Sequence, residues 1–522
     1  MAQADIRQLA EAATRAFQAE RLEEAESYAM QALRAQPGEP QSSEILGRVR
    51  LNERRFNEAI EYLEAGFKGA PESPVLANLI GTAYAGKAKF DIAIGYFQMA
   101  TEGAPDHPMP WENLGKAAFK LRKWDEARTA FQRCHEIDPN NLEAASGLSR
   151  LELRAGNPER ALELASGILT RVPDHLQSRE VAAEANLELD QFEQALAGAL
   201  TITREPKARV KNKVSAFSIA GQAAEGLGRF DEAFAHHTAM NKLMADTYKD
   251  SMDKAVATVG LELLTEKIEM TPAAGKKVAK WSLSFDRPGP IFVIGFPRCG
   301  TKLLYEKLDE HPLLVGAEKR RPVKAMEDAI RADDGPARVA AFTEEDVYAF
   351  RKGYWENVAA AGLVVPEGGR TIELKPFYSQ HMTAFGQVYP DAKWLFVHRD
   401  PRDIILSCFQ SYQAGLRSMH EFLEISSAAR YYDLVMEAAK VSRESLDLDV
   451  IDVAYDDFTT DLNGTVMGLF ERMGLPCGDD ILRGLSPPPT RKGTGTRWRN
   501  YEAQLAPVQD TLDKWVKHFG YD

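Results

Sequence analysis

A period of 34 residues organises the first part of the chain. Alanines recur at this spacing at Ala25, Ala59, Ala93, Ala127, Ala161 and Ala195. Two further ladders keep the same period: small residues at Ala13, Gly47, Gly81 and Gly115, and prolines at Pro37, Pro71, Pro105, Pro139 and Pro173. Small residues let two helices approach closely, and a proline ends a helix because its nitrogen carries no hydrogen. The period therefore predicts stacked pairs of antiparallel helices.

Residues 113–140 carry a small residue, aromatic residues, an alanine and a proline in the order typical of one such pair. This pattern resembles the tetratricopeptide repeat family. Five repeats keep the period, a sixth shifts its proline to Pro206, and a seventh begins at Gly221 after an insertion of four residues. We expect an all-α solenoid of six to seven hairpins over residues 1–245. The resemblance implies a concave surface that holds a peptide or protein, and an array that only scaffolds or dimerises the rest of the chain is the alternative.

Charge is spread evenly along the chain. Lys plus Arg number 30 against 37 Asp plus Glu in residues 1–250, and 34 against 40 in residues 251–522. Because neither half is basic, nucleic acid is a poor candidate partner. The four cysteines lack CxxC or Cys/His ligand spacing, and no stretch approaches about 18 uninterrupted apolar residues. We expect a cytoplasmic protein with no transmembrane segment and no metal, and we leave a homo-oligomer open.

The repeat register is lost after residue 245, and the character of the sequence changes. A helical stretch at 246–285 leads through a turn-rich segment to a second domain, which we place at 286–522. Short apolar, β-branched runs at 291–294, 394–397 and 450–453 predict buried strands. Helical patterns follow the first two runs. Alternating strands and helices predict an α/β domain with a parallel sheet.

The first strand leads into a glycine loop and then a helix, an arrangement whose N–H groups converge on a phosphate. Gly295 and Gly300 have Walker A spacing, but Thr301-Lys302 reverses the Lys-Ser/Thr order of that motif. Residues 297–304 resemble instead the 5′-phosphosulfate loop of sulfotransferases. Cys299 and Lys302 depart from it, and Cys299 is a weaker donor than the usual serine. The resemblance implies a nucleotide-binding set of Arg298, Cys299, Gly300, Thr301 and Lys302.

Further motifs follow in the order of the same family. Arg399 follows the second strand with Ser407 eight residues on, which resembles the family's 3′-phosphate site, and Asp400 suits the cap of the next helix. Tyr455 matches a tyrosine near the adenosine. The stretch 490–501 resembles the C-terminal signature, which implies that Arg491, Lys492 and Gly493 fold over the 3′-phosphate. The motifs together imply a P-loop-like domain that uses 3′-phosphoadenosine 5′-phosphosulfate (PAPS) and releases adenosine 3′,5′-bisphosphate (PAP).

The catalytic residues are taken from the same resemblance. Residues 308–318 are similar to a stretch of tyrosylprotein and bacterial sulfotransferases whose loop glutamate faces the acceptor, which makes Glu318 our candidate base. His311 and His398 are alternatives. Arg298 and Lys375 would stabilise charge at the leaving and equatorial oxygens. Lys375 stands one position from the family's lysine, and in an extended segment that shift would turn it to the opposite face.

The motifs predict a PAPS-dependent sulfotransferase that acts on a hydroxyl group. The motifs leave three classes of acceptor open. The first is a peptide or protein, for example through a tyrosine hydroxyl, and the others are a carbohydrate and a small molecule. One rival is a magnesium-dependent nucleoside-triphosphate enzyme that uses the near-Walker loop. The other is a non-enzymatic repeat scaffold with a degenerate nucleotide fold, which Cys299 and the displaced Lys375 favour.

Overall fold

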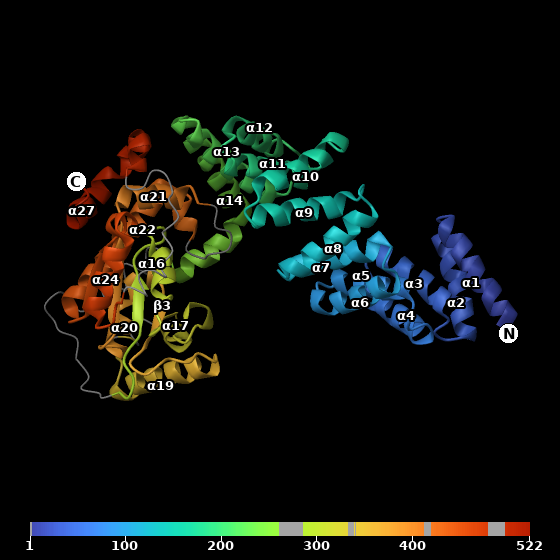
Figure 1. The fold of residues 1–522 in the computed structure, drawn as a ribbon, viewed down its shortest axis with the longest axis horizontal. Coiled ribbons are helices and arrows are strands. Elements are labelled where there is room, and N and C mark those ends of the chain that lie inside the picture. Colours follow the sequence, from blue (N-terminus) through green and yellow to red (C-terminus); the bar gives the residue numbers. More distant parts are fainter. Residues whose placement is uncertain (1–2, 260–284, 332–338, 340, 412–418, 479–495) are drawn as a thin grey trace. The chain divides into compact units, whose positions relative to one another are not determined.

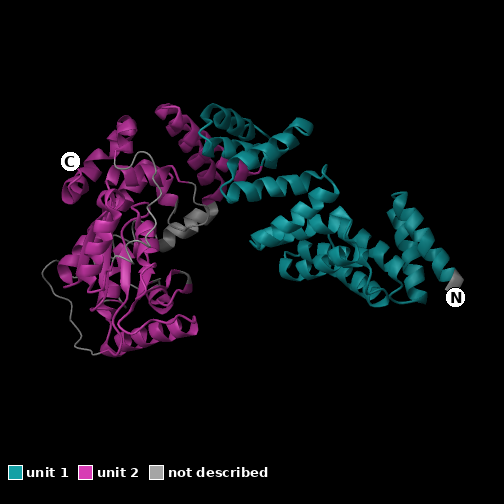
Figure 2. Cartoon of the chain, viewed as in Figure 1, with its two compact units in different colours: residues 1–208 teal, residues 209–522 magenta. Residues whose placement is uncertain are grey.

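The computed structural model describes residues 3–259, 285–331, 339, 341–411, 419–478 and 496–522 of the 522-residue chain. The chain forms two compact units, Met1–Ala208 and Arg209–Asp522 (Figure 2). We call them unit 1 and unit 2. The predicted domain boundaries at residues 245 and 286 stay predictions. No helix among the described residues is both long and apolar enough to cross a membrane.

Unit 1 is a helical solenoid, as the 34-residue period predicted (Figure 1). Its hairpins are α1 (Gln3–Gln18) with α2 (Leu22–Ala35), α3 (Pro40–Asn52) with α4 (Phe56–Gly69), α5 (Pro74–Gly86) with α6 (Phe90–Gly103), α7 (Pro108–Lys120) with α8 (Trp124–Ile137), α9 (Leu142–Arg154) with α10 (Pro158–Arg171), and α11 (Leu176–Glu188) with α12 (Phe192–Thr203).

The residue ladders explain how the hairpins pack. All six alanines of the ladder are fully buried. A Cβ atom placed on Gly81 would lie 2.6 Å from the ring of Phe97, so only glycine allows α5 and α6 to come this close. Each ladder proline stands two residues beyond the end of the second helix of its hairpin, where a helix could not continue.

One ladder escaped the sequence analysis, and it lies in the turn inside each hairpin. Positive φ angles recur every 34 residues at Glu20, Arg54, Ala88, Arg122, Gly156 and Asp190. Only one of the six is glycine, so no single residue type marks the position. The left-handed backbone is costly for the other five side chains, and the repeated packing on either side of the turn imposes it.

Unit 2 begins with a seventh hairpin, α13 (Val210–Gly226) and α14 (Phe230–Val259). Ala233 is fully buried and continues the alanine ladder after the four-residue insertion. The hairpin therefore has the repeat pattern of unit 1 but belongs to the compact body of unit 2.

A five-stranded sheet forms the centre of unit 2, and all of its pairings are parallel. The strands lie in the order β2 (Leu314–Gly316), β3 (Arg370–Leu374), β1 (Ile291–Ile294), β4 (Lys393–His398) and β5 (Asp449–Ala454). These bounds confirm the three predicted strands. The predicted α/β class with a parallel sheet is correct.

Helices cover the sheet and complete one hydrophobic core with it (Figure 1). The α-helices are α16 (Thr301–Leu308), α17 (Lys324–Arg331), α19 (Glu344–Ala360), α20 (Met382–Val388), α21 (Pro401–Phe409), α22 (Ile425–Ser445), α23 (Tyr455–Thr460), α24 (Leu462–Met473), α26 (Glu502–Leu505) and α27 (Gln509–Phe519). Short 3₁₀ turns are η1 (Glu318–Arg320), η2 (Pro376–His381), η3 (Met419–Phe422), η4 (Arg497–Tyr501) and η5 (Ala506–Val508).

Candidate active site

The carboxyl ends of the five strands form one edge of the sheet, and predicted site residues follow each of them. Parallel strands bring such residues together even when they are far apart in the sequence. The glycine loop follows the central strand β1, with the ends of β4 and β5 on one side and those of β3 and β2 on the other. The residues concerned are Gly295–Gly300 after β1, Arg399 after β4, Tyr455 after β5, Lys375 after β3 and Glu318 after β2.

The glycine loop turns sharply between β1 and α16. Gly300, with φ of 103°, precedes α16, and a Cβ atom there would lie 2.3 Å from the ring of Tyr455. Arg298 also has a positive φ, of 73°. The backbone N–H of Phe296 donates to the sulfur of Cys299 at 3.3 Å, which closes the loop on itself. The first turn of α16 leaves N–H groups without partners inside the helix, and these can bind an anion.

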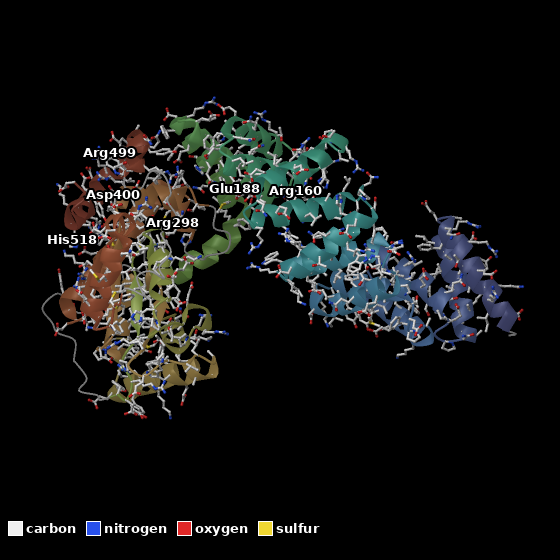
Figure 3. All side chains as sticks on the ribbon, in the orientation of Figure 1. Arg160, Glu188, Arg298, Asp400, Arg499 and His518 are labelled. Atoms are coloured by element: carbon white, nitrogen blue, oxygen red, sulfur yellow. The ribbon has the colours of Figure 1, made fainter. Side chains whose placement is uncertain are left out.

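Arg298 joins the loop to the second predicted anion site. Its Nε donates to the Oγ of Ser407 on α21 at 2.9 Å. Figure 3 labels Arg298 within unit 2. The two residues are 109 positions apart in the sequence. The resemblance implies that Arg298 binds the 5′-phosphosulfate group of the nucleotide and Ser407 its 3′-phosphate. The two motifs are in contact in the structure.

Arg399 lies at the same edge with one donor unused. Its guanidinium carbon is 4.9 Å from the ring centre of Tyr455, and its Nη2 is 3.3 Å from Oδ2 of Asp403. Its Nε is buried and has no hydrogen-bond partner in the described part of the chain. An unpaired buried donor on a cation is costly, and a bound anion would satisfy it. Asp400 caps α21 as predicted, since its side chain accepts from the N–H of Arg402 at 2.9 Å.

Lys375 is held by a carboxylate that the sequence analysis did not find. Its Nζ is 3.2 Å from Oε1 of Glu327 on α17. Tyr378 donates its hydroxyl to the same oxygen at 2.5 Å, and Arg321 binds the other oxygen. Burial alone would raise the pKa of Glu327, but the hydrogen bonds from Tyr378 and Arg321 and the charge of Lys375 lower it to about 2. Glu327 is therefore an anchor for cations rather than a base.

Glu373 is a second carboxylate that the sequence analysis missed. It lies two residues before Lys375, on the same side of the extended segment, and is fully buried. Its Oε1 accepts from the hydroxyl of Tyr354 at 3.1 Å, and its Oε2 has no partner among the described residues. Burial raises its pKa to about 7. The signal in the sequence is weak, because the strand Arg370–Leu374 already holds Arg370 and Thr371, and only its burial in the structure sets Glu373 apart.

Glu318, the candidate base, opens the 3₁₀ turn η1 beside β3. The N–H of Ala317 donates to the carbonyl of Ile372 at 2.9 Å, which fixes the start of the turn against the strand. The charge of Glu318 also contributes to the raised pKa of Glu373, after burial and the nearby Glu327. The carboxylates of Glu318 and Glu373 and the ammonium of Lys375 thus share one region, on the β2–β3 side of the glycine loop.

Comparison with known proteins identifies a family for each of two parts of the chain. The sulfotransferase family model matches residues 290–479, and tetratricopeptide repeat models match residues 11–74, 78–141 and 118–183. The chain joins tetratricopeptide repeats to a sulfotransferase-family domain.

Individual relatives are distant. An uncharacterized protein of Aquifex aeolicus (strain VF5) is 21% identical over 408 residues, which are 73% of this chain and 51% of that protein. The chain thus spans about half the length of that relative. A tetratricopeptide repeat protein from Parabacteroides merdae ATCC 43184 is 15% identical, with a TM-score of 0.34 over 46% of this chain and 93% of its own. YrrB, a repeat protein with a peptide-binding site, is 22% identical, with a TM-score of 0.29 over 32% and 86%.

The two histidines proposed as alternative bases have other partners in the sulfotransferase-family domain. His311 is 1% exposed, with Nε2 2.8 Å from the carbonyl of Pro476 and Nδ1 accepting from the N–H of Leu313 at 3.1 Å. The ring of His398 stacks on Phe519 at 4.8 Å and lines a separate cavity of about 450 Å³ that none of residues 295–302 lines. Burial lowers the pKa of His398. We leave both histidines out of the proposed catalytic set.

The remaining predicted nucleotide ligands have different surroundings. The side chain of Lys302 is 77% exposed and lies 3.6 Å from Glu306 on the same helix. Cys299 and Thr301 are buried, and burial raises the pKa of the Cys299 thiol to about 11. The residues of the predicted C-terminal cover lie outside the described residues: Arg491, Lys492 and Gly493. No group of three or more His, Cys, Asp or Glu side chains arranged like metal ligands occurs in the described ranges.

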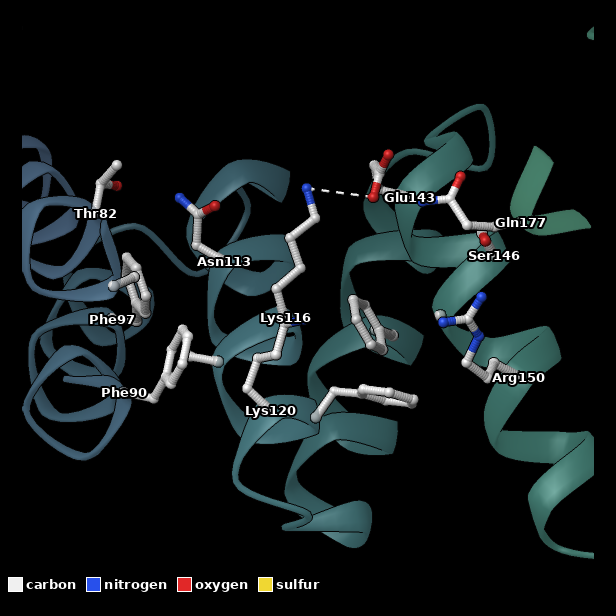
Figure 4. Close-up of a pocket in the computed structure, with 15 residues that line it drawn as sticks. Thr82, Phe90, Phe97, Asn113, Lys116, Lys120, Glu143, Ser146, Arg150 and Gln177 are labelled. Atoms are coloured by element: carbon white, nitrogen blue, oxygen red, sulfur yellow. Dashed lines mark ion pairs between the residues drawn. The ribbon is translucent and has the colours of Figure 1, made fainter. Parts of the chain in front are cut away.

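The tetratricopeptide repeats of unit 1 carry a pocket of about 340 Å³ (Figure 4). Four phenylalanines contribute to its lining: Phe90, Phe97, Phe119 and Phe131. Lys116, Lys120 and Arg150 also line it, together with Glu143, whose Oε2 is 3.4 Å from Nζ of Lys116. Glu112 also pairs with Lys116, and Glu180 lies 3.6 Å from Arg150, so the charges around the aromatic lining are largely balanced.

Proposed function

We propose that the sulfotransferase-family domain transfers a sulfuryl group from PAPS to a hydroxyl group of an acceptor. One observation carries the proposal. Two predicted anion sites meet at the carboxyl edge of the sheet, through the contact of Arg298 with Ser407. The ring of Tyr455 lies close both to Gly300 of one site and to Arg399 of the other. This arrangement suits a ligand that has two separated phosphates and a flat base.

The residues divide into donor and acceptor groups. We propose that Ser407, Arg399 and the loop N–H groups bind PAP, and that the segment with Arg491, Lys492 and Gly493 covers its 3′-phosphate. When bound, PAPS supplies the sulfuryl group, whose bond to the 5′-phosphate oxygen breaks as the acceptor oxygen bonds to sulfur. Arg298 and Lys375 stabilise the negative charge on the leaving phosphate and the sulfuryl oxygens.

The acceptor hydroxyl must lose its proton as the new bond forms. We propose that the carboxylate of Glu318 is the base that takes this proton. Glu327 holds the ammonium of Lys375 at 3.2 Å and so orients it. Glu373 is the alternative base, because burial raises its pKa to about 7. A base must contact the acceptor hydroxyl, directly or through one water, which a half-buried Glu318 permits more easily than a fully buried Glu373.

We further propose that the acceptor is a peptide or protein and that the repeats bind it or a partner. The aromatic lining of the unit 1 pocket supports this choice, because it can bind an apolar side chain. A carbohydrate or a small-molecule hydroxyl is the alternative acceptor. A cytoplasmic location and a homo-oligomeric state stay predictions of the sequence.

A transfer assay tests the proposal. The full-length protein is incubated with [³⁵S]PAPS and with tyrosine-containing acidic peptides, glycans or simple phenols, and both labelled product and PAP are measured. We expect label in a peptide hydroxyl without added metal. Glu318→Gln should lower turnover about a hundredfold or more and leave PAP affinity unchanged. The control Glu310→Gln alters a carboxylate eight residues earlier in the chain that pairs with Lys307, and it should retain turnover.

Two results would overturn the proposal. Release of phosphate from ATP or GTP only with magnesium would favour the triphosphate enzyme, and no transfer with any acceptor would favour the scaffold. Unchanged turnover in Glu318→Gln would remove that residue from its role, and a large loss in Glu373→Gln at unchanged PAP affinity would assign the base to Glu373.

A further inference from the structure

The seventh hairpin packs directly on the sulfotransferase-family domain within unit 2 (Figure 2). Asn241 of α14 is 2% exposed, and its Nδ2 donates to the carbonyl of Phe409 at the end of α21, at 2.9 Å. The ring of Phe234 stacks on that of Phe409 at 4.8 Å, and Phe230 meets Tyr501 edge-on at 5.5 Å. The hairpin thus covers the C-terminal end of the helix that carries Ser407.

One carboxylate joins this hairpin to two parts of the domain. Glu225, near the end of α13, accepts from Nη2 of Arg497 at 2.6 Å and also from its Nε. It accepts from the hydroxyl of Tyr501 at 3.0 Å and from Nε2 of Gln410, the C-cap of α21, at 3.4 Å. Charge-assisted hydrogen bonds of this kind are stronger than neutral ones, so Glu225 fixes both η4 and the end of α21.

The contacts continue from η4 to the nucleotide site. The N–H of Trp498, next to Arg497, donates to Oδ1 of Asp403 at 2.9 Å. The other oxygen of Asp403 lies 3.3 Å from Nη2 of Arg399. The side chain of Asp403 is 1% exposed, and the guanidinium of Arg402 lies 3.7 Å over the ring of Trp498. Asp403 therefore has little freedom, and its orientation depends on the position of η4.

We propose that Glu225 is a positioning residue for the nucleotide site. By fixing Arg497 it sets the backbone of Trp498, which holds Asp403, and Asp403 orients Arg399 toward the anion. The inference rests on the proposed function of Arg399. A residue of the last repeat thereby tunes donor affinity without touching the nucleotide, and the seventh hairpin is part of the donor site.

Calorimetric titration of the full-length protein with PAP tests this inference. Glu225→Gln keeps the size of the side chain but removes its charge, and PAP affinity should fall about three- to tenfold. Arg497→Gln removes the other partner and should give the same loss. Measuring both variants keeps the test decisive if one of them folds poorly.

A matched control separates positioning from a loosened interface. Asp231 of α14 accepts from Nε2 of Gln504 at 2.5 Å, so Asp231→Asn weakens the same interface at a point outside the series of contacts. Its PAP affinity should equal that of the unaltered protein. Glu225→Gln combined with Asp403→Asn should bind PAP no more weakly than the weaker-binding single variant, because both act through Arg399.

The outcomes that contradict the inference are specific. Unchanged PAP affinity in Glu225→Gln and Arg497→Gln, an equal loss in Asp231→Asn, or additive losses in the double variant would each overturn it, even if the unaltered protein binds PAP. Failure of the unaltered protein to bind PAP would overturn the proposed function first, and the inference with it.

Discussion

Units 1 and 2 differ in how far along the sequence their defining contacts reach. In unit 1, Gly81 packs on Phe97 of the same hairpin, and Gly47 and Gly115 make the equivalent contacts with Leu63 and Phe131, 16 residues away in each case. In unit 2, Arg298 reaches Ser407 over 109 positions and Glu225 reaches Arg497 over 272. A short period therefore predicts unit 1 almost completely, whereas the site of unit 2 depends on the strand order of the sheet.

The units also differ in what they bury. The buried ladder positions of unit 1 are mostly alanines and glycines, whose effect is steric, and unit 1 also buries Arg50 in ion pairs with Glu26 and Glu53. Unit 2 buries charged groups beside its site, among them Glu327, Glu373 and Asp403. Substitutions at the buried ladder positions should therefore change packing in unit 1, and substitutions of the buried charged groups beside the site should change ionisation or ligand binding in unit 2. The predictions below test this contrast.

The largest expected effect concerns pH and Glu373. Its pKa is raised from 4.5 to about 7, so the folded state binds the proton more tightly and the free energy of unfolding falls as pH rises from about 4.5 to 7, by about 3 kcal/mol. Burial lowers the pKa of His237 to about 4, which gives the opposite slope between about pH 4 and 6.5. Glu373→Gln removes the first slope, so its free energy of unfolding should rise more steeply with pH than that of the unaltered protein.

Denaturation by urea at pH 5 and pH 7, followed by tryptophan fluorescence, measures this difference. Glu356→Gln, on the exposed surface of α19, is the control and should behave like the unaltered protein. Equal pH dependence in Glu373→Gln and the unaltered protein would show that Glu373 does not titrate as its burial predicts.

Removing Arg399 should have the next largest effect. A charge-assisted hydrogen bond is worth about 1.5–3 kcal/mol, so Arg399→Ala should bind PAP about 10- to 150-fold more weakly. Arg160→Ala is the control, because it removes an arginine of unit 1 that is exposed and pairs with Glu163. It should leave PAP affinity unchanged. Calorimetry that finds the same PAP affinity in both variants would remove Arg399 from the nucleotide site.

A pair of glycine variants compares the units directly. Gly81→Ala places a Cβ atom 2.6 Å from Phe97, and overpacking of this kind costs about 1–3 kcal/mol of stability. It should leave PAP affinity intact. Gly300→Ala meets Tyr455 at 2.3 Å with φ of 103°, so it should also weaken PAP binding. Thermal melting and PAP titration of both variants measure these effects. A loss of PAP affinity in Gly81→Ala but not in Gly300→Ala would contradict the contrast between the two units.

The smallest expected effect lies in the turns of unit 1. Gly156 has φ of 80° and open space around it, so Gly156→Ala should cost about 1 kcal/mol through backbone strain alone. Ala88 holds the equivalent position with φ of 58°, so Ala88→Gly should relieve the backbone strain there. Glycine also loses more conformational entropy on folding, so the net stabilisation should be less than about 1 kcal/mol. Thermal melting of both variants measures the two changes in stability. If both variants were stabilised, or both destabilised, backbone strain at the turn would not be the cause.

The sequence predicted most of the fold and part of the candidate site. The 34-residue ladders and the apolar runs predicted the hairpins and three strands, because each signal is local. The motifs also named Arg298, Ser407, Arg399 and Tyr455, which the structure brings into contact in pairs. Glu327, Glu373 and Glu225 were missed, because their importance comes from contacts with distant segments and not from any spacing.

Binding of PAP to the purified full-length protein tests the central claim most directly. A melting scan with PAP alone is compared with scans in ATP or GTP plus magnesium. At a hundredfold excess over its dissociation constant a true ligand adds about 2.7 kcal/mol of stability. We predict a clear rise in melting temperature with PAP in the absence of metal. No rise with PAP, or a rise only with a triphosphate and magnesium, would contradict the assignment of the site.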